Sequence, residues 1–224
     1  MDIREVKQEL IKYGKRAGKK NFTPGISGNM SARVGENILI TTSGSANGYL
    51  KEGDFALINF DGSLVEGTHH PESPSAAHLT KDAKKPSSEK MLHVEFYKMR
   101  PDVNYIIHVH SPCLSAFASC RTALDEAIMA ENVFYFGQIP LADYALPSTE
   151  DLVRKTAKYF KDYTAVLMAN HGFIVGDKTI RDAYLKLELA ESYAQVVLNT
   201  KILGGASLLN QQEIDEINRL RGNV

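Results

Sequence analysis

Two histidines separated by a single residue, His108 and His110, are the side chains whose spacing first suggests chemistry. Their apolar surroundings, residues 106–111, read as a β-strand, whose period of two places both imidazoles on one face and Ile107 and Val109 on the other. Two imidazoles side by side on a rigid strand can chelate one divalent metal ion. The same spacing also fits two histidines on a solvated surface, so a metal site needs ligands from elsewhere in the chain.

A third histidine and a carboxylate occur where they can supply those ligands. The apolar run of residues 165–169 reads as a buried strand that delivers His171 at its end, and Gly172 would let the backbone bend close to a neighbour. Glu89 stands at the predicted start of a helix. Three histidines with an acidic neighbour form a candidate catalytic zinc site, in which one coordination position stays open for substrate.

Three segments rich in hydroxyls and glycine are suited to binding an anion. They lie around Asn29, at Ser43-Gly44, and at Ser87-Ser88 ahead of the helix that begins near Glu89. Turns with glycine expose backbone N–H groups, and a helix N-terminus carries a partial positive charge. The alternatives are an ordinary turn and a serine helix cap complemented by Glu89. Combined with a metal, the segments indicate a phosphorylated, oxygen-rich substrate that chelates the ion.

Composition excludes several classes of partner. The 224 residues are 43% hydrophobic, and 26 basic against 27 acidic side chains leave a formal charge of −1. This balance predicts neither nucleic-acid nor membrane binding, and no apolar run is long enough to span a bilayer. Because the N-terminus opens with charges, we expect a cytoplasmic protein with a small-molecule partner. Cys113 and Cys120 are too far apart on a predicted helix for a disulfide, although Cys113 is a weak candidate metal ligand.

Helices and strands alternate along the whole chain, and we expect one domain, residues 1–224, that contains an antiparallel sheet. The stretch of residues 67–86 loses periodicity and predicts an exposed loop whose three histidines are solvated. Val133 to Phe136 looks like a strand that Gly137 ends. The predicted helices span residues 2–20, from 86 onward, 112–120, 148–160, 179–203 and 210–220; the other predicted strands lie at 38–42, 55–59, 64–65, 165–169 and 173–175; the loop histidines are His69, His70 and His78.

Taken in order, these motifs resemble the class II aldolase/adducin-head family, and within it the fuculose-1-phosphate aldolase branch, over nearly the whole chain. The motifs are Gly25-x-Ser27-Gly28-Asn29, Thr41-x-Ser43-Gly44, Pro86-Ser87-Ser88-Glu89 with His93, His108-x-His110 and His171-Gly172. The resemblance implies an α/β fold: a single three-layer α/β/α domain around a central, mostly antiparallel sheet. It also implies a homotetramer with active sites at subunit interfaces.

The resemblance assigns roles to the residues singled out above. One Zn²⁺ per subunit would be held by three histidines and, in the resting enzyme, by Glu89, which becomes the catalytic acid/base once substrate displaces it. The implied reaction is reversible cleavage of a ketose 1-phosphate to dihydroxyacetone phosphate and an aldehyde. The implied metal ligands are His108, His110, His171 and Glu89, and the implied phosphate-binding residues are Asn29, Ser43, Gly44, Ser87 and Ser88.

The chain departs from the fuculose-phosphate branch on the aldehyde side. Met129 stands where that branch has a tyrosine, and residues 219–224 lack the second tyrosine. Glu131 or Tyr135 could substitute, although a tyrosine in an apolar run also fits a core position. Ile26 replaces a threonine of the first glycine loop. These departures weaken a prediction of fuculose specificity.

Other members of the family are alternatives. In ribulose-5-phosphate 4-epimerase, aspartates stand where this chain has Glu89 and Val133, which favours an aldolase here. Methylthioribulose-1-phosphate dehydratase shares the His-Val-His and Asn-His-Gly runs but differs before Glu89. An aldolase for 5-deoxy-sugar phosphates would have less need of the missing tyrosines. A metal-free, adducin-like interaction module would have lost its ligands, which this chain keeps.

Overall fold

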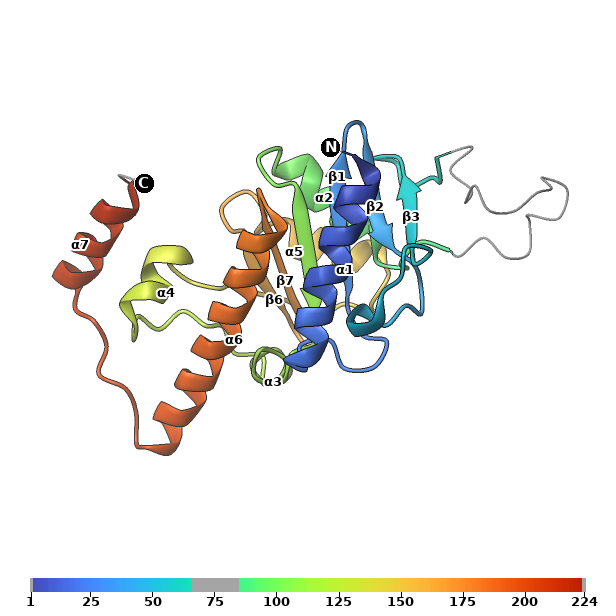
Figure 1. Cartoon of the computed structure of the whole chain (residues 1–224). Helices are drawn as coiled ribbons and strands as arrows, with labels where there is room; N and C mark the ends of the chain where they lie inside the picture. Colours follow the sequence, from blue (N-terminus) through green and yellow to red (C-terminus); the bar gives the residue numbers. More distant parts are fainter. Residues whose placement is uncertain (1, 66–84, 223–224) are drawn as a thin grey trace, which may run out of the picture.

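The computed structural model describes residues 2–65 and 85–222, and a single seven-stranded sheet forms its centre (Figure 1). The strand order is β3-β2-β1-β4-β7-β6-β5, and every neighbouring pair is antiparallel except β5 with β6. This confirms the mostly antiparallel sheet. The strands are β1 (Asn29–Val34), β2 (Asn37–Thr41), β3 (Phe55–Ile58), β4 (Tyr105–Val109), β5 (Leu141–Ala142), β6 (Ala165–Met168) and β7 (Gly172–Asp177).

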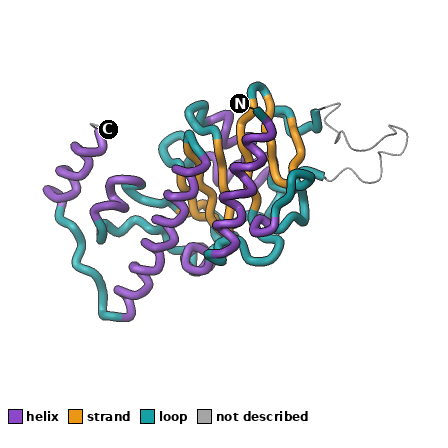
Figure 2. Tube along the Cα trace, viewed as in Figure 1, coloured by secondary structure: helices purple, strands orange, loops and turns teal. Residues whose placement is uncertain are grey.

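Helices cover both faces of the sheet, so the α/β fold has the three layers expected (Figure 2). On one face α1, α3 and α6 pack against alternate strand residues such as Ile107 and Val175, and on the other α2 and α5 pack against Ile106 and Ile174. Successive strand residues therefore alternate between the two apolar clusters, as the two-residue period of a β-strand requires. The helices are α1 (Ile3–Lys19), η1 (Asn47–Tyr49), α2 (Lys90–Met99), α3 (Pro112–Ser119), α4 (Ala130–Tyr135), α5 (Glu150–Ala157), α6 (Ile180–Ile202) and α7 (Gln211–Gly222).

Hydrogen bonds at helix ends explain where three of the expected helices begin. The side chains of Asp2 and Thr149 accept from the first turns of α1 and α5, and Asn210 and Glu213 form a reciprocal capping box ahead of α7. Gly62, in the turn after β3, has a positive φ of 84°. These features depend on residues close in sequence, which is why the sequence shows them.

Two expectations of secondary structure are wrong. The predicted strand at Val133 is the helix α4, in which Val133 and Phe136 are buried three residues apart while Tyr135 is exposed, a helical rather than an alternating pattern. Strand β1 begins at Asn29, inside a segment expected to be a loop. Its pairing with β4 decides this, and that partner lies far away in sequence.

The predicted exposed loop of residues 67–86 lies outside the described residues apart from Lys85 and Pro86, and so do His69, His70 and His78. Lys85 accepts a backbone hydrogen bond from Ser43, and Pro86 forms an isolated bridge with Thr42. The chain therefore re-enters the described structure beside the end of β2.

In the described part of the chain, no helix combines the length and apolarity needed to cross a bilayer. Cys113 and Cys120 are both free thiols, as their separation predicted. Cys113 is buried, and its Sγ donates to the side chain of Gln195 at 3.0 Å.

A carboxylate on α6 secures the chain just after the histidine strand. Glu191 accepts hydrogen bonds from the Ser111 hydroxyl at 2.7 Å and from the backbone N–H groups of Cys113 and Leu114 at 2.8 and 3.0 Å. Ser111 is the N-cap residue of α3, and its own side chain makes no capping bond. A carboxylate at a helix N-terminus accepts hydrogen bonds from the unpaired N–H groups there, and its negative charge is attracted to the positive end of the helix dipole. Glu191 therefore ties the end of β4 to α6.

We predict that Glu191→Ala lowers the free energy of unfolding by about 3 kcal/mol, because three charge-assisted hydrogen bonds are lost and the N–H groups stay partly buried. Glu191→Gln retains one acceptor oxygen and should lose about 1 kcal/mol. Urea denaturation followed by circular dichroism measures both. Equal losses in the two variants would show that the carboxylate is not what holds this helix.

Candidate metal and substrate site

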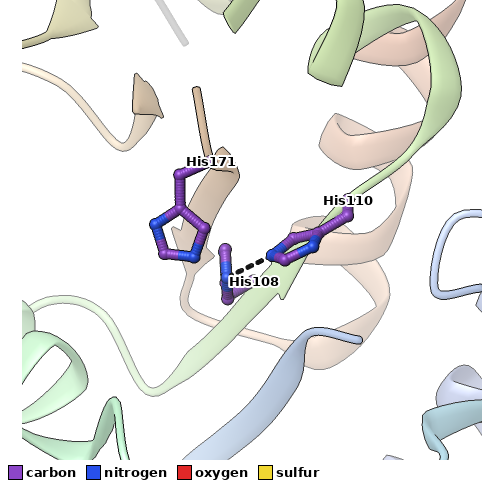
Figure 3. Close-up of side chains that lie close together, drawn as sticks. All are labelled: His108, His110 and His171. Carbon is purple, nitrogen blue, oxygen red and sulfur yellow. Dashed lines mark hydrogen bonds between the residues drawn. The ribbon is translucent and has the colours of Figure 1, made fainter. Parts of the chain in front are cut away.

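The three predicted histidines converge at the end of the central strands β4 and β7 (Figure 3). His108 lies in β4, His110 directly follows that strand, and His171 precedes β7. The Nε2 atoms of His108 and His110 are 3.0 Å apart, and the ring centroids of all three pairs are separated by 4.9 to 5.1 Å. One nitrogen from each ring lies within 4.8 Å of the others. This cluster could hold a metal ion.

The orientation of His108 suits a ligand. Its Nδ1 lies 2.9 Å from the carbonyl oxygen of Phe173, which can only accept, so Nδ1 carries the hydrogen. In the neutral ring Nε2 then presents a lone pair to the cluster. His171 Nδ1 is buried and makes no hydrogen bond within the described part of the protein. Burial and the neighbouring imidazoles lower the pKa of His110 to about 3, which keeps that ring neutral, as metal binding requires.

Glu89 faces this cluster from the N-terminus of α2. Its Oε2 lies 3.1 Å from His108 Nε2, its Oε1 lies 3.1 Å from His171 Nε2, and the side chain is 9% exposed. Burial alone would raise the pKa of Glu89, but the two imidazoles against it lower that pKa well below its ordinary value. The carboxylate thus draws positive charge to this point, whether a proton or a metal ion. Three imidazoles and one carboxylate are a donor set that fits zinc.

Glu89 does not cap α2 in the way the alternative interpretation required. It occupies the N-cap position but makes no side-chain capping bond. Instead the hydroxyl oxygen of Ser87 accepts from the Glu89 backbone N–H at 3.3 Å. The carboxylate is therefore free to turn toward the histidines.

Two glycines let neighbouring segments approach the histidine strand. A Cβ at Gly28 would lie 2.4 Å from the carbonyl oxygen of His108, and a Cβ at Gly172 would lie 2.5 Å from that of Val109 and 2.7 Å from the ring of His110. Any side chain there would displace backbone. The close approach predicted for Gly172 is confirmed.

The three hydroxyl- and glycine-rich segments open into one cleft with Glu89, His110 and His171. They come from the turn before β1, the turn after β2 and the approach to α2. The cleft has a volume of about 510 Å³, and its walls are formed by Ile26, Ser27, Gly28, Asn29, Thr42, Ser43, Gly44, Ser45, Ser87, Ser88, Glu89, His110, Pro147, Ser148, Asn170 and His171. The structure thus brings all five predicted phosphate-binding residues together with the metal cluster.

Ser148 also lines this cleft, although the sequence analysis treated it only as part of a helix start. Thr149 is the N-cap residue of α5, and Ser148 before it has a positive φ of 65°, which is uncommon outside glycine. Its hydroxyl donates to that of Ser88 at 2.8 Å. Backbone strain of this kind concentrates at functional sites, but no periodicity in the sequence indicates it.

The residues considered for the aldehyde side lie elsewhere. Tyr135 is 49% exposed, so the core interpretation is wrong, and it lines a second cleft with Tyr163 and Ala165 at the start of β6. His171 follows the other end of β6. Glu131 is exposed on α4 with Tyr135. Within one chain, neither residue lines the cleft that contains the histidines.

Comparisons with known proteins agree with this geometry. A family model described as Class II Aldolase and Adducin N-terminal domain matches residues 8–198. The chain is 32% identical over 192 residues to an L-fuculose phosphate aldolase of Methanocaldococcus jannaschii, covering 86% of this chain and 95% of the relative. It is 31% identical over 219 residues to a 5-deoxy-D-ribulose 1-phosphate aldolase of Bacillus thuringiensis, covering 97% and 95%.

A further relative carries a different activity in its name. A 3-oxo-tetronate 4-phosphate decarboxylase of Haemophilus influenzae is 27% identical over 196 residues, covering 85% of each chain. Among solved structures, an L-fuculose 1-phosphate aldolase matches with a TM-score of 0.84 and 30% identity, over 97% of this chain and 96% of that one. Since the family model and these relatives span most of its length, the chain belongs to the class II aldolase and adducin family.

Proposed function

We propose that this protein is a zinc-dependent aldolase that reversibly cleaves a ketose 1-phosphate into dihydroxyacetone phosphate and an aldehyde. The observation that carries the proposal is the meeting of the histidine cluster and Glu89 with three anion-binding segments in one cleft. The aldolases among the relatives support it. Because sugar phosphates are charged and stay where they are made, we place the reaction in the cytoplasm.

The metal would be one Zn²⁺ per subunit, held by His108, His110 and His171, with Glu89 as a further ligand before substrate binds. When bound, the ion would act as a Lewis acid that stabilises the negative charge left beside the carbonyl when the C3–C4 bond breaks. The cleft leaves room on one side of the cluster, where His110 and His171 line its wall.

The phosphate would lie between the turn after β2 and the start of α2. Ser43 and Gly44 come from the first, and Ser87 and Ser88 from the second. Hydroxyls and backbone N–H groups at a helix N-terminus bind phosphate without needing a lysine. Asn29 remains in this set because its amide nitrogen has two N–H groups and the contact with Glu89 uses one. The phosphate anchor would hold the three-carbon half of the substrate against Glu89.

Glu89 would transfer the proton at C3 of the three-carbon fragment. Its carboxylate is nearly buried, lies against the histidine cluster and also lines the cleft proposed to bind substrate, so the same group can serve both. Positioned carboxylates of this kind contribute about 10²- to 10⁴-fold to rate. We therefore assign to Glu89 the role of acid/base.

The aldehyde half is best matched by a 5-deoxy sugar. Met129 replaces a tyrosine by which the fuculose-phosphate branch would bind a terminal hydroxyl, and the 5-deoxy-D-ribulose 1-phosphate aldolase aligns with 97% of this chain. The decarboxylase relative makes decarboxylation a second candidate reaction. Loss of CO₂ from the carbon beside a carbonyl leaves negative charge on that carbon, as cleavage of the C3–C4 bond does. Dehydratase and epimerase activities on sugar phosphates are further alternatives.

We also propose a homotetramer with its active sites at subunit interfaces. The end of α6, the segment after it and α7 extend from the body of the fold beside α4 (Figure 1). Ile202, Leu203, Leu208 and Leu220 there are 60 to 83% exposed. Apolar area of this kind is typical of a surface covered by another subunit.

Light scattering after gel filtration should give four times the 24.8 kDa of the chain. A monomer at micromolar concentration would contradict the proposal.

Zinc binding is the first prediction about the chemistry of the site. The metal-free protein should bind one Zn²⁺ per chain, and zinc at about 100 times its dissociation constant should raise the free energy of unfolding by about 2.7 kcal/mol. His110→Ala should abolish this gain, whereas Glu36→Ala, a change in the exposed turn between β1 and β2, should leave it intact. Calorimetric titration and thermal unfolding measure both effects. Unchanged zinc binding in His110→Ala would place the site elsewhere.

Turnover is the second prediction. Zinc-loaded protein incubated with dihydroxyacetone phosphate and a panel of aldehydes, including acetaldehyde and lactaldehyde, should form ketose 1-phosphates. Glu89→Gln should reduce kcat by about 10²- to 10⁴-fold with little change in KM for dihydroxyacetone phosphate, because proton transfer is lost and binding is not. Glu36→Gln, in an exposed turn, is the charge-matched control.

A panel without products would count against an aldolase. If a 3-oxo acid 4-phosphate then released CO₂ in the same assay, the chain would be a decarboxylase. Near-normal turnover in Glu89→Gln would refute the role assigned to that carboxylate.

A further inference from the structure

A chain of hydrogen bonds runs from Glu89 into the interior between β1 and α2. Asn29 Nδ2 donates to Glu89 Oε2 at 3.0 Å, and Asn29 Oδ1 lies 2.5 Å from His93 Nε2. On the far side of the ring, His93 Nδ1 lies 2.7 Å from the hydroxyl of Ser31, which lies 2.8 Å from that of Tyr97. Each of these side chains is at most 9% exposed.

The roles of all these groups follow from one fact, that a carboxylate only accepts. Asn29 must turn its NH₂ group to Glu89, which leaves its carbonyl oxygen toward His93. His93 must then carry its hydrogen on Nε2. Burial lowers the pKa of His93 to about 3, so the ring is neutral and Nδ1 accepts from Ser31. Ser31, its one hydrogen used, accepts from Tyr97, whose hydroxyl lies nearer to Ser31, at 2.8 Å, than to its other acceptor, the carbonyl oxygen of Asn104, at 3.4 Å. The chain is polarised in a single direction and ends on Glu89.

The residues of this hydrogen-bond chain lie on one face of a helix and one face of a strand. Glu89, His93 and Tyr97 are four residues apart on one face of α2, and Asn29 and Ser31 are two apart on one face of β1. Asn29 pairs in register with His108 across the sheet. Apolar side chains at the interior positions would fill this space at less cost, because burial of polar groups is unfavourable unless each is bonded. A requirement at Glu89 would explain why polar residues occupy them.

We propose that His93 is a positioning residue that, through Asn29, holds the carboxylate of Glu89 in the orientation needed at the metal cluster. The donor on His93 Nε2 prevents the Asn29 amide from turning its oxygen toward Glu89. Ser31 and Tyr97 hold the imidazole in that tautomer. The inference rests on the proposed function for its kinetic consequence, but its structural consequence for Glu89 does not depend on the substrate.

Two substitutions of similar polarity test this proposal. His93→Gln keeps an N–H near the position of Nε2, whereas His93→Asn reaches only the position of Nδ1 and leaves Asn29 Oδ1 without a donor. We expect His93→Asn to lower kcat about 10- to 100-fold with KM for dihydroxyacetone phosphate within about threefold, as removal of an outer partner does in metal sites. His93→Gln should retain kcat within about fivefold of the unchanged protein.

The second readout is the affinity for Zn²⁺, measured by competition with a chromophoric chelator. His93→Asn should weaken it about 10-fold or more and His93→Gln much less, because Glu89 is a ligand of the resting site. This measurement decides the proposal even if no aldehyde is accepted, so failure of the aldolase assignment and failure of the role of His93 are distinguishable. Thermal unfolding of both variants provides the check on folding.

Three results would overturn the proposal. Equal losses of kcat and of zinc affinity in the two variants would show a merely structural role. Unchanged values in His93→Asn would show no role. The third result comes from nitrogen-15 spectra of the histidine side chains in the unchanged protein. A hydrogen on Nδ1 of His93 would mean that Nε2 cannot donate to Asn29, and the proposed series of hydrogen bonds would not exist.

Discussion

The buried contact of Glu89 with the imidazoles of His108 and His171 is the interaction on which the rest of this site depends. A carboxylate with little access to water is unfavourable beside these rings unless positive charge joins it. That requirement makes the cluster a place for a cation. It also makes the same carboxylate, once released from the cluster, a group able to transfer a proton to a substrate in the cleft.

The fold meets this requirement by bringing strand ends together. β4 ends at the histidines, β7 begins beside them, and β1 starts at Asn29 opposite His108. Gly28 and Gly172 allow the neighbours to approach, and Glu191 secures the chain just beyond the cluster. The helices α1, α6, α2 and α5 pack on the two faces of the central strands whose ends carry the ligands. Rigid ligands bind a metal without a large loss of conformational entropy.

The described residues surround the part of the cleft proposed to bind phosphate, whereas none of the residues considered for the aldehyde half lines the cleft. On the phosphate side, hydroxyls and backbone of three segments surround the space next to Glu89, and Ser148 adds a strained residue to that wall. The residues considered for the aldehyde half lie outside these walls: Met129 carries no hydroxyl, and Tyr135 faces solvent from α4. This asymmetry fits a family whose members share the phosphorylated half of the substrate and differ in the other half.

By itself, the sequence determined the fold class and singled out the histidines, Glu89 and the glycine-rich segments that the structure brings to one cleft, because a strand period, helix caps and glycine-rich turns depend on residues close together along the chain. It also indicated that His171 would approach His108 and His110. Only the tertiary structure decided that α4 is a helix, that Ser148 enters the cleft and that Asn29 joins Glu89 to His93. The last of these depends on the pairing of β1 with β4 and the packing of α2 against β1, contacts between residues about 60 to 80 positions apart that no local pattern records.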